Sequence, residues 1–169
     1  MFRYALLLAV CLVCFSQAYR RKYLYCSYCS NGRYVTSLIN VQNRPKGDWS
    51  IGMRCGGNEA QHDCTFTSVR YEKDNSLHFL CPGNKVLNGF YLYSDNRYVL
   101  NRDYSFRCCN IKDKRPKNCN LTPWLNGCEE DLNYQVPEGR VITGLYSLAQ
   151  NDTSSKTQDR RWRLQVCDI

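Results

Sequence analysis

The chain has 169 residues with a formal net charge of +8, and aromatic side chains make up 13% of it. Aromatic residues favour β-strands and long apolar helical patterns are absent, so the composition favours one compact all-β domain over a helical bundle. After the N-terminal apolar run, no segment has the roughly 20 apolar residues that a membrane-spanning helix needs. The composition therefore argues against a helical membrane protein.

Residues 1–18 have the pattern of a signal peptide. Arg3 gives a short basic start, residues 4–15 form an apolar core, and the small residue Ala18 closes the segment where signal peptidase would cut. We therefore expect a secreted protein whose folded domain spans residues 19–169, with a signal anchor as the alternative. Without the leader, 22 basic residues remain against 15 acidic ones.

The secreted domain keeps ten of the twelve cysteines, an even number that indicates a disulfide framework in an oxidising compartment. These cysteines are Cys26, Cys29, Cys55, Cys64, Cys81, Cys108, Cys109, Cys119, Cys128 and Cys167. A zinc site at Cys26-x-x-Cys29 is the alternative, but the chain has no second pair at the spacing of a zinc finger. We therefore expect every cysteine to be bonded, with no metal and no cofactor.

Taken in chain order, three segments share one pattern. Each has a turn with glycine or proline, a strand of alternating apolar residues, a polar loop, and a second strand that ends in cysteine. They cover about residues 23–55, 77–109 and 132–167. A repeat of this length is one supersecondary unit that cannot bury its apolar face alone, so we predict a pseudo-threefold domain of three antiparallel β repeats.

The second strand of each repeat carries an aromatic residue that we expect in the core. In the third repeat a period of two places Trp162 on the inner face and Arg161 and Arg163 on the outer face. The matching residues are Arg102 and Tyr104 in the second repeat and Trp49 in the first. Asp159 and Arg160 form either an exposed adhesive patch or a structural pair at the start of the strand. Their recurrence beside a core aromatic favours the structural interpretation.

Strand parity predicts two of the disulfides. Cys81 and Cys108 each continue the core-facing side of their strands, so two such strands laid side by side would bring them together. The same logic pairs Cys29 with Cys55. Cys109 and Cys167 have the opposite parity, and we expect them to bond outside their own strand pair. Their candidate partners are Cys26, Cys64, Cys119 and Cys128.

The Asp-Arg-x-Trp strand that runs into cysteine at residues 159–167, together with the doublet Cys108-Cys109, resembles the dermatopontin family. The resemblance covers nearly all of the chain after about residue 23. It implies a non-catalytic extracellular-matrix protein that contacts proteoglycans, other matrix proteins and cell surfaces and assists collagen fibril assembly. Some invertebrate relatives look like agglutinins and some venom components share the fold. A secreted carbohydrate-binding defence protein is therefore the alternative.

Basic residues cluster at Arg20-Arg21-Lys22, at residues 112–117 and on the last strand. We predict residues 112–128 to be a basic, proline-bearing loop stapled by Cys119 and Cys128. Clustered cations on a secreted protein favour sulfated glycosaminoglycans over nucleic acid as partners, and a merely solvated surface is the alternative. The predicted polyanion-binding residues are Lys112, Lys114, Arg115, Lys117, Arg161 and Arg163.

Catalytic signals are weak, and we do not expect an enzyme. His62 and His78 are the only histidines, bonded cysteines cannot act as nucleophiles, and the acidic run Glu129-Glu130-Asp131 is typical of a solvated turn. Sequons make Asn120 and Asn151 candidate glycosylation sites, with Asn151 favoured because it lies in a predicted polar loop. Tyr134 lies beside the acidic run, and the family resemblance implies that it is a candidate for sulfation.

Overall fold

The computed structural model describes residues 22–30, 32–43, 48–69, 76–94, 102–127, 130–151 and 158–169. These residues contain eleven β-strands and no helix, which confirms the predicted all-β class. The strands are β1 (Lys22–Tyr28), β2 (Tyr34–Asn43), β3 (Asp48–Gly56), β4 (Gln61–Val69), β5 (Leu77–Leu80), β6 (Val86–Ser94), β7 (Arg102–Ile111), β8 (Lys117–Leu121), β9 (Leu132–Gln135), β10 (Arg140–Asn151) and β11 (Gln158–Asp168). The expected signal peptide lies outside the described residues, within which no helix is long and apolar enough to cross a membrane.

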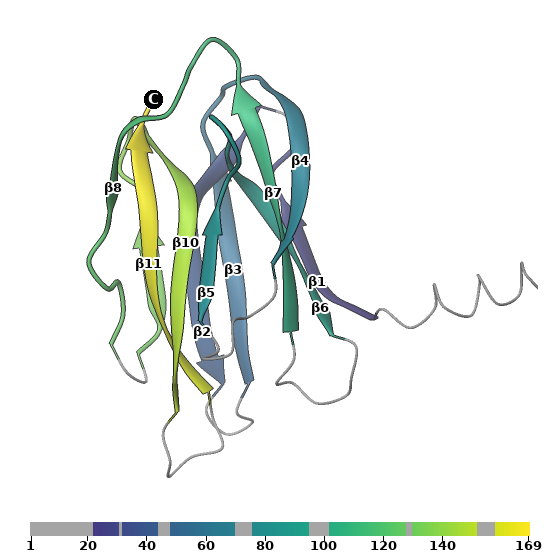
Figure 1. Ribbon diagram of the computed structural model, residues 1–169, viewed down its shortest axis with the longest axis vertical. Helices are drawn as coiled ribbons and strands as arrows, with labels where there is room; N and C mark the ends of the chain where they lie inside the picture. Colours follow the sequence, from purple (N-terminus) through teal and green to yellow (C-terminus); the bar gives the residue numbers. More distant parts are fainter. Residues whose placement is uncertain are drawn as a thin grey trace, which may run out of the picture.

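The strands form three antiparallel sheets that stand around one core (Figure 1). Their strand orders are β1-β6-β7-β4, β5-β10-β11-β8 and β3-β2-β9. Each sheet is built on one long hairpin, and the first strands of the three hairpins, β2, β6 and β10, contact one another. Each hairpin therefore buries its apolar face against the other two.

The short strand that begins each unit pairs with the hairpin of another unit. β1 pairs with β6, β5 pairs with β10, and β9 returns to β2. The expectation that the entering strand lies beside the returning strand of its own repeat is wrong, because the turn after each short strand carries the chain into a different sheet. The units are thus linked cyclically, and the threefold symmetry of the arrangement stays a prediction.

Each hairpin has a bulge at the same place. The register shifts around Thr36 in β2, Asn88 in β6 and Thr143 in β10. The carbonyls of these three residues accept backbone hydrogen bonds of 2.8 Å from Val136, Cys29 and Cys81, respectively, the residues that follow the short strands. The bulge therefore fixes where each exchanged strand ends, as irregularities in a ladder often do.

Four disulfides connect the described strands. Cys29–Cys55 and Cys81–Cys108 cross between sheets, and they are the two pairs that strand parity predicts. Cys64–Cys109 joins β4 to β7, and Cys119–Cys167 joins β8 to β11. The crossing bonds tie sheets that share no hydrogen-bonded edge, and the other two hold an edge strand onto its hairpin.

Two expectations about the cysteines are wrong. The staple between Cys119 and Cys128 does not form, because residues 117–121 are the edge strand β8, which pairs with β11 and places Cys119 beside Cys167. Among the described cysteines, Cys26 forms no disulfide, and its side chain is exposed. Cys128 lies outside the described residues.

Trp162 and Tyr104 are fully buried in the common core, as their strand parity predicts. They lie at matching positions, four residues before Val166 and Cys108. In the first unit the residue four before Cys55 is Ile51, which is also buried. Ile51, Tyr104 and Trp162 each pair with the residue that lies four positions after the bulge of their hairpin. The counterpart of the two buried aromatic residues in the first unit is therefore the aliphatic Ile51 and not Trp49.

Arg160 supports the structural interpretation of the Asp-Arg-x-Trp motif. Its side chain is only 2% exposed, and Nη1 donates a 2.8 Å hydrogen bond to Ser147 Oγ on β10. Its carbonyl accepts a 2.8 Å bond from Asn126 Nδ2, and Asn126 Oδ1 accepts from Trp162 N at 2.9 Å. The side chains of Asp159, Arg102 and Trp49 lie outside the described part of the chain.

Candidate functional site

A basic cleft lies at the end of the sheets where β4 begins and β7 ends. It encloses a volume of about 990 Å³. Four predicted polyanion-binding residues line it: Lys112, Lys114, Arg115 and Lys117. The other lining residues are Ala60, Gln61, His62, Asn84, Asn110, Ile111 and Asp113.

The basic segment after β7 is held in place by contacts with the chain that precedes β4. Lys112 N donates to Ala60 O at 2.8 Å, and Lys114 Nζ lies 2.6 Å from Glu59 Oε1. Asp113 adopts a left-handed conformation with a φ of 59°, which Asp tolerates better than most residues. The backbone therefore turns tightly here and presents successive basic side chains to the cleft.

The charges in the cleft are mostly positive. Lys112, Arg115 and Lys117 are exposed, and Asp113 is the one acidic side chain among the described lining residues. The hydrogen bond from Lys114 to Glu59 raises the pKa of Lys114. Such a surface can hold an anionic group by charge-assisted hydrogen bonds. The described residues contain no group of three or more potential metal ligands.

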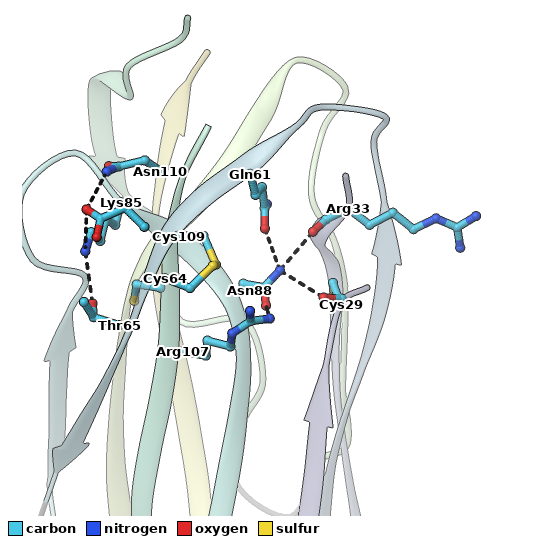
Figure 2. Close-up of a disulfide and its surroundings, with 12 residues drawn as sticks. Cys29, Arg33, Gln61, Cys64, Thr65, Lys85, Asn88, Arg107, Cys109 and Asn110 are labelled. Carbon is cyan, nitrogen blue, oxygen red and sulfur yellow. Dashed lines mark hydrogen bonds and ion pairs between the residues drawn. A yellow bond between two sulfur atoms is a disulfide. The ribbon is translucent and has the colours of Figure 1, made fainter. Parts of the chain in front are cut away.

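A hydrogen-bond network centred on Asn88 lies next to the cleft (Figure 2). Asn88 Nδ2 lies within hydrogen-bond distance of Gln61 Oε1, Arg33 O and Cys29 O, at 2.7, 3.0 and 3.3 Å. Its Oδ1 accepts from Arg107 Nη1 at 2.5 Å. Asn88 is 1% exposed, so this network fixes Gln61, which lines the cleft, from inside the protein.

Beside that network, β4 is fastened to its neighbours by both covalent and polar contacts. Figure 2 shows the Cys64–Cys109 disulfide next to Lys85 and Asn110. Asp63 accepts from Asn110 Nδ2 at 3.1 Å and forms a 3.2 Å ion pair with Lys85. The wall of the cleft is therefore rigidly attached to the hairpin β6-β7.

The structure divides the six predicted polyanion-binding residues between two surfaces. Four line the basic cleft, whereas Arg161 and Arg163 lie half-buried on the outer face of β11. Lys117 belongs to β8 rather than to a loop, although its side chain is exposed. Arg20 and Arg21 lie outside the described residues. Sequence reasoning missed the contributions of Asn84 and Asn110, because neither belongs to a charge cluster and only the fold brings them to the cleft.

The remaining candidates are spread over the surface. His62 lines the cleft, whereas His78 is exposed on β5, where its ring stacks on Tyr146 at 4.4 Å between centroids. Glu130 accepts a 2.7 Å hydrogen bond from Gly127 N, which is a structural role within the turn.

Of the three modification candidates, Asn120 and Tyr134 have side chains in the described part of the chain. Asn120 is exposed on the edge strand β8, whereas Asn151 ends β10 and its side chain lies outside the described set. Tyr134 is half-buried on β9, and burial raises the pKa of its hydroxyl. An exposed sequon suits a glycan, and modification at each of these positions stays a prediction.

The described residues thus form a disulfide-rich all-β domain whose sheets are cross-linked and whose surface carries a basic cleft. The family model described as Dermatopontin matches residues 20–169, and the chain therefore belongs to the dermatopontin family. Family membership and the disulfide framework support an extracellular, non-enzymatic protein.

Two relatives match along most of the chain. The "Hemagglutinin/amebocyte aggregation factor" of Limulus polyphemus is 34% identical over 135 residues, which cover 79% of this chain and 74% of that protein. A "Dermatopontin" of Biomphalaria glabrata is 26% identical over 141 residues, which cover 82% of this chain and 90% of that protein. No solved structure matches the chain.

Proposed function

We propose that this protein is a secreted matrix and adhesion protein that binds sulfated glycosaminoglycans and proteoglycans through the basic cleft. The gathering of Lys112, Lys114, Arg115 and Lys117 around one cleft is the observation that carries the proposal. Their side chains come from one short segment, so a sulfated chain could contact several cations at once. Contacts with other matrix proteins, and an effect on collagen fibril organisation, would follow from tethering to such chains.

Heparin chromatography of the full chain tests this proposal. We expect the variant in which Lys112, Lys114, Arg115 and Lys117 are all replaced by Gln to elute at clearly lower salt, because polyanion binding depends on the counterions that bound cations release. Its melting temperature should stay close to that of the wild type, since these side chains are exposed. Elution at the wild-type salt concentration would remove the cleft as the site.

An agglutinin that binds defined sugars is the second candidate function. It is favoured by the similarity to a protein named as a hemagglutinin and aggregation factor. Binding of this kind would depend on aromatic surfaces and neutral hydrogen-bonding groups, so it would survive high salt. Retention on a neutral-sugar resin at high salt separates this function from polyanion binding.

A further inference from the structure

A second groove lies on the outer face of the sheet β5-β10-β11-β8, away from the basic cleft. It encloses about 270 Å³, below the usual range for a site that holds a drug-sized ligand. Across its floor, His78, Tyr146 and Arg163 are direct cross-strand neighbours on β5, β10 and β11. Its walls include Leu121, Trp124 and Leu148. The space suits a single ring-sized group.

Arg163 forms the positive end of this groove, where it and Arg161 both pack against the ring of Trp124. The guanidinium of Arg163 lies 5.3 Å from the centre of the Trp124 ring, and that of Arg161 lies 4.9 Å from it. Arg163 Nε donates to Thr122 O at 2.9 Å, and Arg161 Nε donates to Asn126 O at 3.3 Å. These bonds use the Nε atoms, so both guanidiniums are held in position before a ligand arrives.

The segment that carries Trp124 is itself fixed to β11. Thr122 N donates to Leu164 O and Leu125 N donates to Trp162 O, both at 2.9 Å. Thr122 Oγ1 also accepts from Leu164 N at 3.0 Å. The aromatic wall is therefore part of the rigid sheet, which lowers the entropic cost of ordering a binding site.

The matching positions in the other two sheets do not carry this combination. The row His78, Tyr146 and Arg163 corresponds by register to Cys26, Tyr91 and Ser105 in the sheet of β6. In the sheet of β2 it corresponds to the uncharged row Asn133, Ile39 and Gly52. The fold therefore does not require an arginine at this position of the row. In the sheet of β6 an arginine also lies among aromatic rings, since Arg107 is 5.0 Å from the centre of the Tyr28 ring and 5.9 Å from that of Phe66, but it donates to the buried Asn88. Arg163 instead lines the groove.

We propose that this groove binds a pyranose sugar that carries a carboxylate. The planar fork of Arg163 matches a carboxylate bidentately, and none of the described lining residues is acidic. Tyr146 and Trp124 supply the aromatic surface for the apolar face of the ring, and His78 supplies a hydrogen-bonding group for a hydroxyl. This site is separate from the basic cleft, because the two ends of β8, Lys117 and Leu121, belong to one site each.

Titration of the full chain with monosaccharides, followed by NMR, tests the proposal. The probes are methyl β-glucuronide, which represents a uronate within a polysaccharide, and the methyl glycoside of N-acetylneuraminic acid, which represents a glycan terminus. Methyl β-glucoside and acetate are the neutral-sugar and simple-carboxylate controls. We expect at least one acidic sugar to bind at least tenfold more tightly than both controls. Binding of the glucuronide would indicate a uronate within a polysaccharide as the natural ligand, and binding of the N-acetylneuraminic acid glycoside would indicate a glycan terminus.

Variants locate the binding. Arg163→Gln and Trp124→Leu should each weaken binding of the acidic sugar at least fivefold, and Arg163→Lys should restore only part of it because lysine lacks the planar fork. The cleft variant Lys112→Gln/Arg115→Gln should bind the sugar as the wild type does. Equal binding of acetate or of the neutral glucoside would overturn the proposal. An unchanged affinity in both Arg163→Gln and Trp124→Leu, with wild-type melting temperatures, would overturn it as well.

Discussion

At the scale of single residues, buried polar side chains tie neighbouring strands and loops to one another. Asn88 lies at a bulge where β1, β6 and the start of β4 meet, and it bonds to a residue from each neighbouring segment. Arg160 plays a similar part between β11 and β10. A buried polar group is stable only when it is paired, so losing one member leaves the others unsatisfied.

The substitution Asn88→Ala should lower the free energy of unfolding by about 1 to 3 kcal/mol, because it leaves Arg107 and the buried carbonyl of Cys29 without this partner. Urea denaturation measures this value. Asn133→Ala is the matched control, since Asn133 is exposed on β9 and its loss should cost less than about 0.5 kcal/mol. Equal effects of the two substitutions would show that the network around Asn88 contributes nothing specific.

Glu59 tunes the basic cleft at the same scale. It pairs with Lys114, so Glu59→Gln should leave that lysine uncompensated while its ammonium remains charged at neutral pH. We expect this variant to elute from heparin at higher salt than the wild type. Glu130→Gln changes the net charge equally but lies outside the cleft, and it should elute near the wild-type position. Lower salt for Glu59→Gln would mean that Glu59 positions Lys114 rather than competing for it.

At the scale of elements, the junctions between the sheets are closed by disulfides in two units and by apolar packing in the third. Cys29–Cys55 and Cys81–Cys108 cross between sheets, whereas Val136 and Val166 stand at the equivalent positions of the third unit. Both valines are buried in the common core. Hydrophobic packing therefore closes the third junction where disulfides close the other two.

The double variant Val136→Cys/Val166→Cys should form a further crossing disulfide. If the third junction repeats the geometry of the others, the new bond should stabilise the fold by about 2 to 4 kcal/mol, mainly by constraining the unfolded chain. Mass spectrometry of the non-reduced protein detects the bond, and melting with and without reductant measures its effect. Two free thiols in the folded variant would contradict the proposed equivalence of the three units.

At the scale of the whole molecule, the sequence was informative about periodicity and not about strand exchange. Alternating residues around Trp162 predict a core strand and its inner face, because parity is a local property of the chain. The pairing of β1, β5 and β9 with the hairpins of other units depends on long-range contacts, which strand parity does not predict. The same limit explains why parity identified Cys81 and Cys108 as partners but placed their strands side by side, whereas the bond crosses between sheets.

The basic cleft was predictable only in part for the same reason. The run Lys112 to Lys117 is visible in the sequence, but Ala60 and Asn84 join it only after β4 and the turn before β6 reach the same end of the molecule. The groove beside Arg163 was not predictable as a site, because Trp124 meets β11 only through β8 and the backbone contacts that follow it.

The salt dependence of heparin affinity should distinguish binding by the local cleft from attraction by the net charge of the whole molecule. Charges farther apart than a Debye length of about 8 Å are screened at physiological ionic strength, so distant cations should add little to binding. The slope of log affinity for heparin against log salt should therefore fall by roughly one for each cleft cation that is removed. Lys112→Gln/Arg115→Gln should therefore lower the slope by about two.

Arg33→Gln/Arg54→Gln is the control, because it removes the same charge from exposed positions outside the cleft and should leave the slope nearly unchanged. Equal slopes for the two double variants would mean that net charge, rather than the cleft, attracts the polyanion.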